Sequence, residues 1–342
     1  MRTGLFCTYE NPNRNYASAY AEQTRLVQHI EDLGFDEAWV AEHHFNPDAA
    51  SPSPLPILAY LAARTSRIRL GTAALLLPFH NPLLVAEEVA TLDILSGGRL
   101  DLGIAKGGPF LAQNKHFGIA REDSQPLAKE AFSLIRKLLS EENVTFEGHH
   151  FNVHGASITP QPIQKPVPIF LATSTPAMIR IAAENDCGIM AGPPFPIEAI
   201  QSSRELYLDA ARMGDPRLVL IRFFHPAPTR AQAVEEATRL LQGFVDRMQA
   251  ATNSMQPAWT PWFKLDRIIE DSLIGTIDEI REKVLRIESK LQPRSLILKP
   301  IHPDIAKRLG DLETFSQIIG ADLQTLADET KKTRPTRQTQ FV

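Results

Sequence analysis

Short apolar runs alternate along the chain with longer stretches that carry apolar residues at helical spacing. After the first run, for example, Leu26, Val27 and Ile30 recur at intervals of three and four, which places them on one face of a helix. Each run has the length of a buried strand. Strands that alternate with helices are typical of parallel α/β folds. The strand-like runs are residues 4–7, 37–41, 68–77, 100–105, 167–172, 187–191, 218–224 and 295–298.

Eight strand-like runs separated by helices predict a closed (β/α)8 TIM barrel. A doubly wound open sheet has the same periodicity and stays open as an alternative. Two segments exceed what a minimal barrel needs: residues 106–166 after the fourth strand, with a hairpin-like stretch at 144–153, and residues 250–272 after the seventh. Barrel active sites lie among the loops that follow the strands. Both inserted segments are therefore expected to form walls or lids over a site.

The length and composition favour one domain. The chain has 342 residues, of which 43% are hydrophobic and 22% charged, an ordinary globular composition. TIM barrels commonly exceed ~250 residues as one domain, and no Gly/Ser run or charge block divides residues 1–330. We therefore expect a single domain over residues 1–330. Residues 331–342, KKTRPTRQTQFV, have the polar character of a flexible tail.

Charge, the lengths of apolar segments and the cysteine content limit the class of protein. The net charge is -4 and the pI about 6.2, and the basic residues are scattered, so no nucleic-acid partner is expected. No segment approaches the ~20 apolar residues of a membrane span, and the first residues lack the apolar core of a signal peptide. Cys7 and Cys187 lie far apart in the chain. These features fit a cytoplasmic protein without disulfides.

A Glu-His-His-Phe sequence directly follows the second predicted strand, at the catalytic end of a barrel. His43 is placed there for proton transfer near neutral pH, or equally as a hydrogen-bonded residue that fixes a loop. A metal site is not expected. Adjacent residues on a strand point to opposite faces, so His43 and His44 would not converge on one ion, and no other cluster has metal-ligand spacing.

Two segments after neighbouring strands offer contacts for an anion. Lys106 begins a Lys-Gly-Gly sequence after the fourth strand, and Thr173 and Ser174 follow the fifth, just before an expected helix start. Taken singly, these segments are an ordinary turn and an ordinary helix cap. Together they favour one phosphate site between the two strands. Ala73 and Ala74, at the end of the third strand, either fill the core or leave space for a flat ring.

Three longer motifs relate this sequence to a known family of proteins. These motifs are GFDEAWVAEHHF (residues 34–45), LGTAALLLP (70–78) and LDILSGGRLDLGIAKG (92–107), with looser matches at 160–174 and 274–284. In this order they resemble the bacterial luciferase-like monooxygenases, and the first half of the chain is similar to the catalytic subunit of luciferase. The resemblance independently implies a (β/α)8 barrel that binds reduced FMN at its mouth.

The resemblance also assigns roles to single residues. His43 matches the catalytic histidine of the family, and Glu42 and His44 flank it in the same motif. The Ala73-Ala74 peptide matches a cis peptide against which the flavin ring packs.

The remaining positions concern the cofactor. Lys106 stands where the family has a basic residue for the FMN phosphate, and Thr173 and Ser174 fall in its phosphate loop. Ala105 replaces the reactive cysteine that luciferase has beside the flavin. Thr173 stands where luciferase has an acidic residue.

These matches imply a flavin-dependent monooxygenase. Reduced FMN (FMNH2) would come from a separate NAD(P)H-dependent flavin reductase, because the chain has no dinucleotide-binding fingerprint. Oxygen would add to form a flavin hydroperoxide, which then oxygenates a mostly apolar organic substrate, such as a carbonyl compound in a Baeyer–Villiger-like reaction or an aldehyde oxidation. The family implies a homodimer paired through residues 83–95. Two alternatives stay open: a deazaflavin-dependent hydride-transfer enzyme of the same superfamily, and a non-catalytic flavin-binding subunit.

Overall fold

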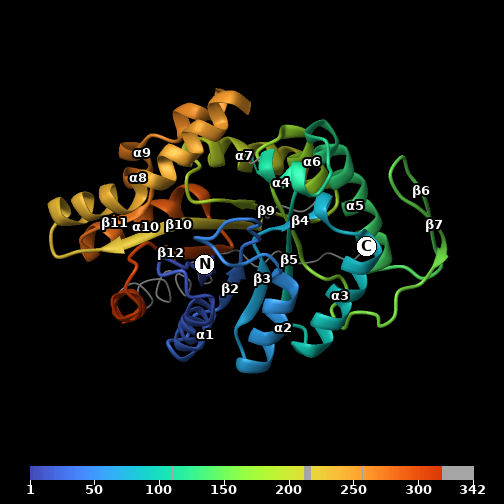
Figure 1. Ribbon diagram of the computed structural model, residues 1–342, viewed down its shortest axis with the longest axis horizontal. Helices are drawn as coiled ribbons and strands as arrows, with labels where there is room; N and C mark the ends of the chain where they lie inside the picture. The colour runs from blue at the N-terminus through green and yellow to red at the C-terminus, as the bar shows by residue number, and fades with distance from the viewer. Residues whose placement is uncertain (109–110, 212–216, 256, 318–342) are drawn as a thin grey trace, which may run out of the picture.

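The computed structural model describes residues 1–108, 111–211, 217–255 and 257–317 (Figure 1). In these residues, the strand pairing forms a closed barrel of eight parallel strands. Strand β12 pairs with β1, with Leu298 opposite Leu5, and β10 pairs with β9, so the sheet has no open end among these strands. The predicted (β/α)8 barrel is therefore confirmed, and the doubly wound sheet is excluded. The barrel strands are β1 (Arg2–Cys7), β2 (Glu37–Val40), β3 (Arg69–Thr72), β5 (Leu100–Ala105), β8 (Ile169–Ala172), β9 (Gly188–Ala191), β10 (Leu218–Pro226) and β12 (Ser295–Pro300).

Helices cover the outside of the barrel (Figure 1). The first begins where the side chain of Asn15 accepts a hydrogen bond from the Ser18 amide, and it buries Leu26, Val27 and Ile30 as the spacing predicted. Gly34 follows at φ +89°, a conformation that glycine adopts without strain. Among the described residues, no helix is both long and apolar enough to cross a membrane. The main outer helices are α1 (Tyr16–Asp32), α2 (Pro54–Arg64), α3 (Pro82–Leu95), α5 (Ser124–Leu138), α6 (Pro176–Glu184), α7 (Ile197–Ala210), α8 (Arg230–Met255) and α10 (Ile277–Leu291).

The two inserted segments follow β5 and β10, the fourth and seventh barrel strands, as predicted. The first contains the short helix α4 (Leu111–His116), the turn η2 (Arg121–Asp123), α5 and the hairpin of β6 (Val144–Glu147) and β7 (Asn152–Ala156). The second follows α8 and contains η3 (Pro257–Trp262), α9 (Leu265–Asp271) and β11 (Leu273–Gly275). The predicted tail, residues 331–342, lies outside the described residues.

The predicted strand at residues 68–77 is wrong in one respect, because it is two strands and a turn. Strand β3 ends at Thr72, β4 (Leu75–Leu76) resumes the pairing with β5, and η1 (Leu77–Phe79) follows. The Thr72 hydroxyl donates to the Gly103 carbonyl at 2.6 Å and accepts from the Gly103 amide at 2.9 Å. The Thr72 side chain thus binds the backbone groups of Gly103 that a continuous strand would bind with its own backbone. The pairing with β5 is interrupted at residues 73–74.

A layer of apolar side chains fills the middle of the barrel. The Trp39 ring occupies the space over Gly71, where an added Cβ would lie 2.3 Å from the indole, and it meets Phe170 edge-on at a centroid distance of 5.5 Å. This layer closes the barrel below its mouth. Its members are Trp39, Phe170, Met190, Val219, Ile221 and Ile297.

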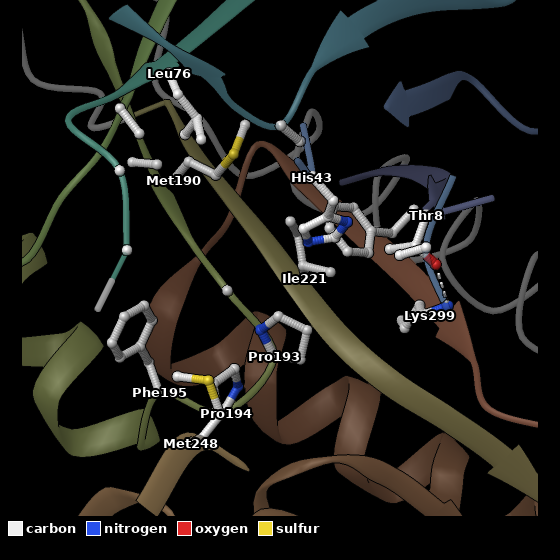
Figure 2. A pocket seen from close by; sticks show the side chains of 18 of the residues that line it. Thr8, His43, Leu76, Met190, Pro193, Pro194, Phe195, Ile221, Met248 and Lys299 are labelled. Atoms are coloured by element: carbon white, nitrogen blue, oxygen red, sulfur yellow. Dashed lines mark hydrogen bonds between the residues drawn. The ribbon is translucent and has the colours of Figure 1, made fainter. Parts of the chain in front are cut away.

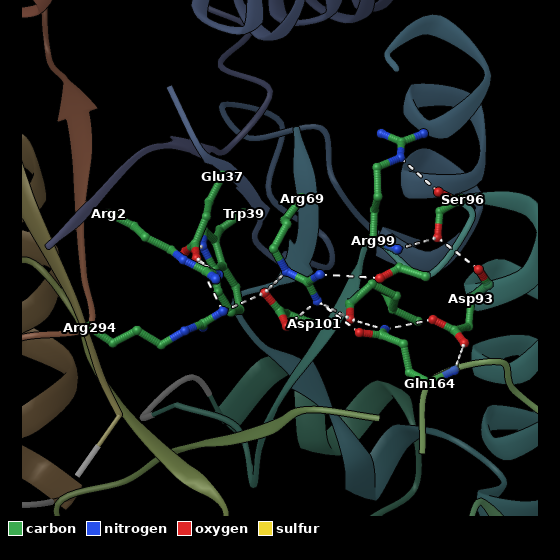
Figure 3. Close-up of polar contacts among 12 residues, drawn as sticks. Arg2, Glu37, Trp39, Arg69, Asp93, Ser96, Arg99, Asp101, Gln164 and Arg294 are labelled. Atoms are coloured by element: carbon green, nitrogen blue, oxygen red, sulfur yellow. Dashed lines mark hydrogen bonds and ion pairs between the residues drawn. The ribbon is translucent and has the colours of Figure 1, made fainter. Parts of the chain in front are cut away.

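Ion pairs close the amino-terminal end of the barrel below this layer (Figure 3). Asp101 is fully buried and accepts hydrogen bonds from Arg69 at 2.7 and 2.9 Å and from Arg294 at 3.2 Å. Arg294 also contacts the buried Glu37 at 3.3 Å and lies over the Phe170 ring. The charges at this end are thus paired with one another, and a layer of apolar side chains separates them from the mouth.

We expect Asp101→Asn to lower the free energy of unfolding by about 3 kcal/mol, because it removes the charge that balances two partly buried guanidinium groups. Urea unfolding measures the change. Glu141→Gln is the control: Glu141 forms an exposed ion pair with Lys137 at 3.9 Å, and its loss should cost less than ~0.5 kcal/mol. Equal effects of the two substitutions would contradict the structural role of Asp101.

Candidate active site

A cavity of about 740 Å³ opens at the carboxyl ends of the barrel strands. Side chains at the ends of the barrel strands line its floor, and the two inserted segments line its walls and roof, as predicted. From the first segment come Gln125 and Phe132, on α5. From the second come Trp259, on η3, and Phe263, in the turn after it, and the preceding helix α8 adds Phe244 and Met248. These side chains form the roof.

His43 lies in the cavity, directly after β2 (Figure 2). Its backbone amide donates to the Ser51 carbonyl at 2.9 Å, which fixes the chain, while the buried Nδ1 of its ring has no hydrogen-bond partner among the described residues. Burial, and next the positive charge of Lys299, lower the pKa of His43 to about 4. The imidazole is therefore neutral at pH 7 and free to exchange a hydrogen bond with a bound molecule.

Glu42 and His44 lie outside the cavity lining, in a separate cluster. Glu42 is buried and its Oε1 contacts Nε2 of His44 at 2.6 Å and of His80 at 2.9 Å, while its Oε2 accepts from the Leu76 amide at 2.8 Å. Burial alone would raise the pKa of Glu42, but these hydrogen bonds hold it below its usual value. The cluster ties the loop after β2 to the turn after β4. Of the three residues predicted as catalytic, the structure thus brings only His43 into the cavity.

The predicted phosphate contacts meet in this cavity. Lys106, Thr173 and Ser174 all line it, and they follow the paired strands β5 and β8. Lys106 is half-buried, and burial and then the charge of Arg121 lower its pKa. The Thr173 hydroxyl accepts a hydrogen bond from the Thr175 amide at 3.1 Å, just before α6 begins. A cation, two hydroxyls and a helix start therefore face one space.

The small residues predicted to face a flat ring are only partly in the lining. Ala73 and Ala105 line the cavity, and Ala74 does not. The Ala73-Ala74 peptide bond is cis, as the resemblance implied. Without bulky side chains at these positions, one wall of the cavity consists largely of backbone and methyl groups.

A second polar group in the cavity was missed from the sequence. Lys299, on β12, donates to Thr8 Oγ1 at 2.7 Å (Figure 2). It also donates to Glu10 Oε1 at 2.5 Å, and all three residues line the cavity. Lys299 and Thr8 follow apolar runs at the carboxyl ends of the last and first strands, which is the position that indicates a site residue in a barrel. In the described part of the chain, no group of three or more His, Cys, Asp or Glu side chains is arranged to hold a metal ion.

The pKa of His43 predicts a pH dependence of stability. Because the pKa falls from the ordinary 6.5 to about 4, the unfolded chain binds a proton in this range that the folded chain does not. Stability should therefore decrease as the pH drops from about 6.5 to about 4, by up to ~3 kcal/mol from this residue. Urea unfolding of wild type and His43→Gln across this range tests this: the variant should lose less stability on acidification. Parallel pH profiles would contradict the buried, neutral state of His43.

Comparison with known proteins supports these observations. Limonene 1,2-monooxygenase of Rhodococcus erythropolis is 35% identical over 88% of this chain and 80% of its own. The oxygenase component of the flavin-dependent trigonelline monooxygenase of Acinetobacter baylyi is 28% identical over 82% and 76%. An F420-dependent glucose-6-phosphate dehydrogenase of Kineococcus radiotolerans is 40% identical, but the match covers only 46% of this chain and 48% of that one.

A solved structure and a family model extend the comparison over most of the chain. The monooxygenase RslO1 of Streptomyces bottropensis superposes with a TM-score of 0.81 at 27% identity, over 94% of this chain and 100% of its own. The model of the luciferase-like monooxygenases matches residues 1–291, which include the barrel strands up to β10 and both inserted segments. The chain therefore belongs to the luciferase-like monooxygenase family.

Proposed function

We propose that the protein is an FMN-dependent monooxygenase that oxygenates a mostly apolar organic substrate. The observation that carries the proposal is the division of one cavity into two ends. Lys106, Thr173 and Ser174 offer an anion site at one end, and beside it lies a largely apolar space that also holds His43, whose Nδ1 has no hydrogen-bond partner among the described residues. A phosphorylated cofactor with a flat ring and an apolar substrate fit side by side in this arrangement.

The residues present fit FMN. Lys106 would pair with its phosphate, and the Thr173 and Ser174 hydroxyls would donate to the same group. Its ring would lie against the methyl groups of Ala73 and Ala105. When bound in its reduced form, FMN supplies two electrons to O2, so that one oxygen atom enters the substrate and the other leaves as water.

The side chains of the protein supply a dry site and a proton carrier. Phe244, Trp259 and Phe263 cover the apolar end and exclude water, which strengthens polar interactions inside the cavity. The His43 imidazole is neutral and its Nδ1 has no hydrogen-bond partner in the described part of the chain, so it is suited to hold or transfer a proton on a reacting oxygen. Glu42 and His44 would act indirectly, by fixing the loop that carries His43.

The substrate and partners belong to the same proposal. A carbonyl compound that undergoes Baeyer–Villiger-like oxygen insertion, or an aldehyde, fits an apolar cavity with few polar groups. The trigonelline relative is an oxygenase component, which supports a separate NAD(P)H-dependent flavin reductase as the source of FMNH2. Exposed apolar side chains on α3, at Leu84, Ile94 and Leu95, support pairing of two copies through this helix.

One competing function has a specific observation in its favour. Two of the relatives are F420-dependent glucose-6-phosphate dehydrogenases, and F420 carries a phosphate that Lys106 would also bind. Such an enzyme transfers a hydride and does not use O2. The monooxygenases matched over most of the chain favour oxygen chemistry.

Turnover with isotopically labelled oxygen separates these functions. The protein is supplied with FMNH2 and 18O2 or, without oxygen, with reduced F420, and cyclooctanone and 2-decanone serve as probes. We expect incorporation of one labelled oxygen atom with FMNH2 and no alcohol formation with reduced F420. His43→Ala should lower this turnover ~10²–10⁴-fold with little change in FMN affinity. Ketone reduction by F420 would support the hydride-transfer enzyme, and FMNH2 binding without product would support a non-catalytic subunit.

The phosphate site has its own test. Lys106→Ala should weaken FMN binding by roughly one to two orders of magnitude, because a charged hydrogen bond contributes ~1.5–3 kcal/mol. Riboflavin lacks the phosphate and serves as the matched ligand, whose affinity should barely change. Fluorescence titration measures both affinities. Equal weakening of the two would mean that Lys106 acts through packing, and no change in either would place the phosphate elsewhere.

A further inference from the structure

The cavity contains a polar group that the proposed FMN site does not use. Lys299 is 8% exposed and lines the cavity, and its ammonium group donates to Thr8 Oγ1 and Glu10 Oε1. An ammonium group has three N–H donors. Within the described part of the chain, two of them are used and no third hydrogen bond is present. One donor thus remains for a bound molecule.

The order of strands separates Lys299 from the phosphate site. Going around the barrel, three strands lie between β12, which carries Lys299, and β5, which leads to Lys106, in either direction. Strand β1, which leads to Thr8, is likewise opposite β8, which leads to Thr173. A phosphate bound at Lys106 therefore does not reach Lys299. The two lysines are anchors at opposite sides of one cavity.

The surroundings of Lys299 describe the group that it would bind. Glu10 already neutralises its charge at 2.5 Å and is itself approached by Arg308 at 3.7 Å. An anionic ligand group on the same nitrogen would meet the Glu10 carboxylate and be repelled. A neutral oxygen acceptor receives the free N–H without this cost. Phe6, on β1, and Ile221 and Phe223, on β10, line the cavity from the two strands beside β12, so they would contact an apolar remainder of the ligand.

We propose that Lys299 binds the carbonyl oxygen of a neutral ketone or aldehyde substrate, with Thr8 and Glu10 holding the ammonium group in place. The inference rests on the proposed monooxygenase function and specifies its substrate class. A hydrogen bond from this N–H polarises the carbonyl group and so favours attack at its carbon. Lys299 would thus both orient the substrate and make its carbonyl carbon more reactive, and His43 lines the same cavity as a neutral proton carrier.

Binding of matched ligands to the FMN-loaded protein tests the proposal without any oxygen reaction. The probes are cyclooctanone and cyclooctane, which differ only in the carbonyl group, and octanoate as an anion. Calorimetry should show that wild type binds cyclooctanone roughly tenfold to a hundredfold more tightly than cyclooctane. The infrared carbonyl stretch of bound cyclooctanone should lie at lower frequency than that of cyclooctanone in an apolar solvent.

Three variants determine whether Lys299 is the cause. Lys299→Met keeps the apolar stem and should abolish both the ketone preference and the infrared shift, while the affinity for cyclooctane stays within about twofold. Lys299→Gln retains a neutral donor and should restore part of both signals; it also covers the case in which Lys299→Met does not fold. Lys290→Met removes an exposed lysine on α10 and should change neither signal.

Several results would overturn the proposal. A ketone preference that survives Lys299→Met would place the carbonyl elsewhere, and a wild type that prefers octanoate to cyclooctanone would make Lys299 an anion site. Binding of neither ring, or binding of both equally, would also refute it. Since the assay needs no turnover, failure of oxygenation with an intact ketone preference refutes only the monooxygenase, and the reverse result refutes only the role of Lys299.

Discussion

Closure of the sheet is the constraint on which the site depends. Parallel pairing of β12 with β1 joins residues that are almost three hundred positions apart, with Leu298 beside Leu5. Once the ring is closed, the carboxyl end of each barrel strand opens on the same mouth. His43, Lys106, Thr173 and Lys299 thereby share one cavity although no two of them come from the same strand–helix unit. In an open sheet, β12 and β1 would be free edges and the Lys299–Thr8 contact would not form.

The ion pairs at the amino-terminal end of the barrel lie apart from the side chains of the candidate site at its mouth. At the amino-terminal end, guanidinium and carboxylate groups around Asp101 pair with one another. At the mouth, polar side chains such as His43 and Lys299 lie among apolar ones, and Nδ1 of His43 has no hydrogen-bond partner among the described residues. Removal of water strengthens each remaining polar contact, and the same removal lowers the pKa of His43 to about 4. A histidine in this setting acts as a neutral hydrogen-bonding group at physiological pH, which limits the roles that it can take in proton transfer.

The features predicted correctly from the sequence are those that depend on hydrophobic periodicity or on position directly after a strand. Apolar runs identified the barrel strands, and the position after a strand identified His43, Lys106 and Thr173. The break at Thr72 was missed because a threonine side chain that replaces backbone hydrogen bonds leaves no mark in the hydrophobic pattern. Glu42 and His44 were grouped with His43 because they are adjacent to it in the motif. Their side chains instead hydrogen-bond to each other outside the cavity lining. Lys299 was missed because its partners are at the other end of the chain.

The arrangement of anchors constrains how this fold accommodates different substrates. Both anchors stand at the ends of barrel strands, whose positions the pairing and the filled interior fix. The roof is built differently, since Phe244, Met248 and Trp259 belong to the long helix α8 and the turn η3, which follow β10. Changes in these elements would alter the shape of the apolar space while the proposed phosphate site and the proposed carbonyl site keep their separation. The distance between the two anchors across the barrel would then determine which carbon of the substrate lies next to the flavin ring. The roof would determine which carbon skeleton fits between the two anchors.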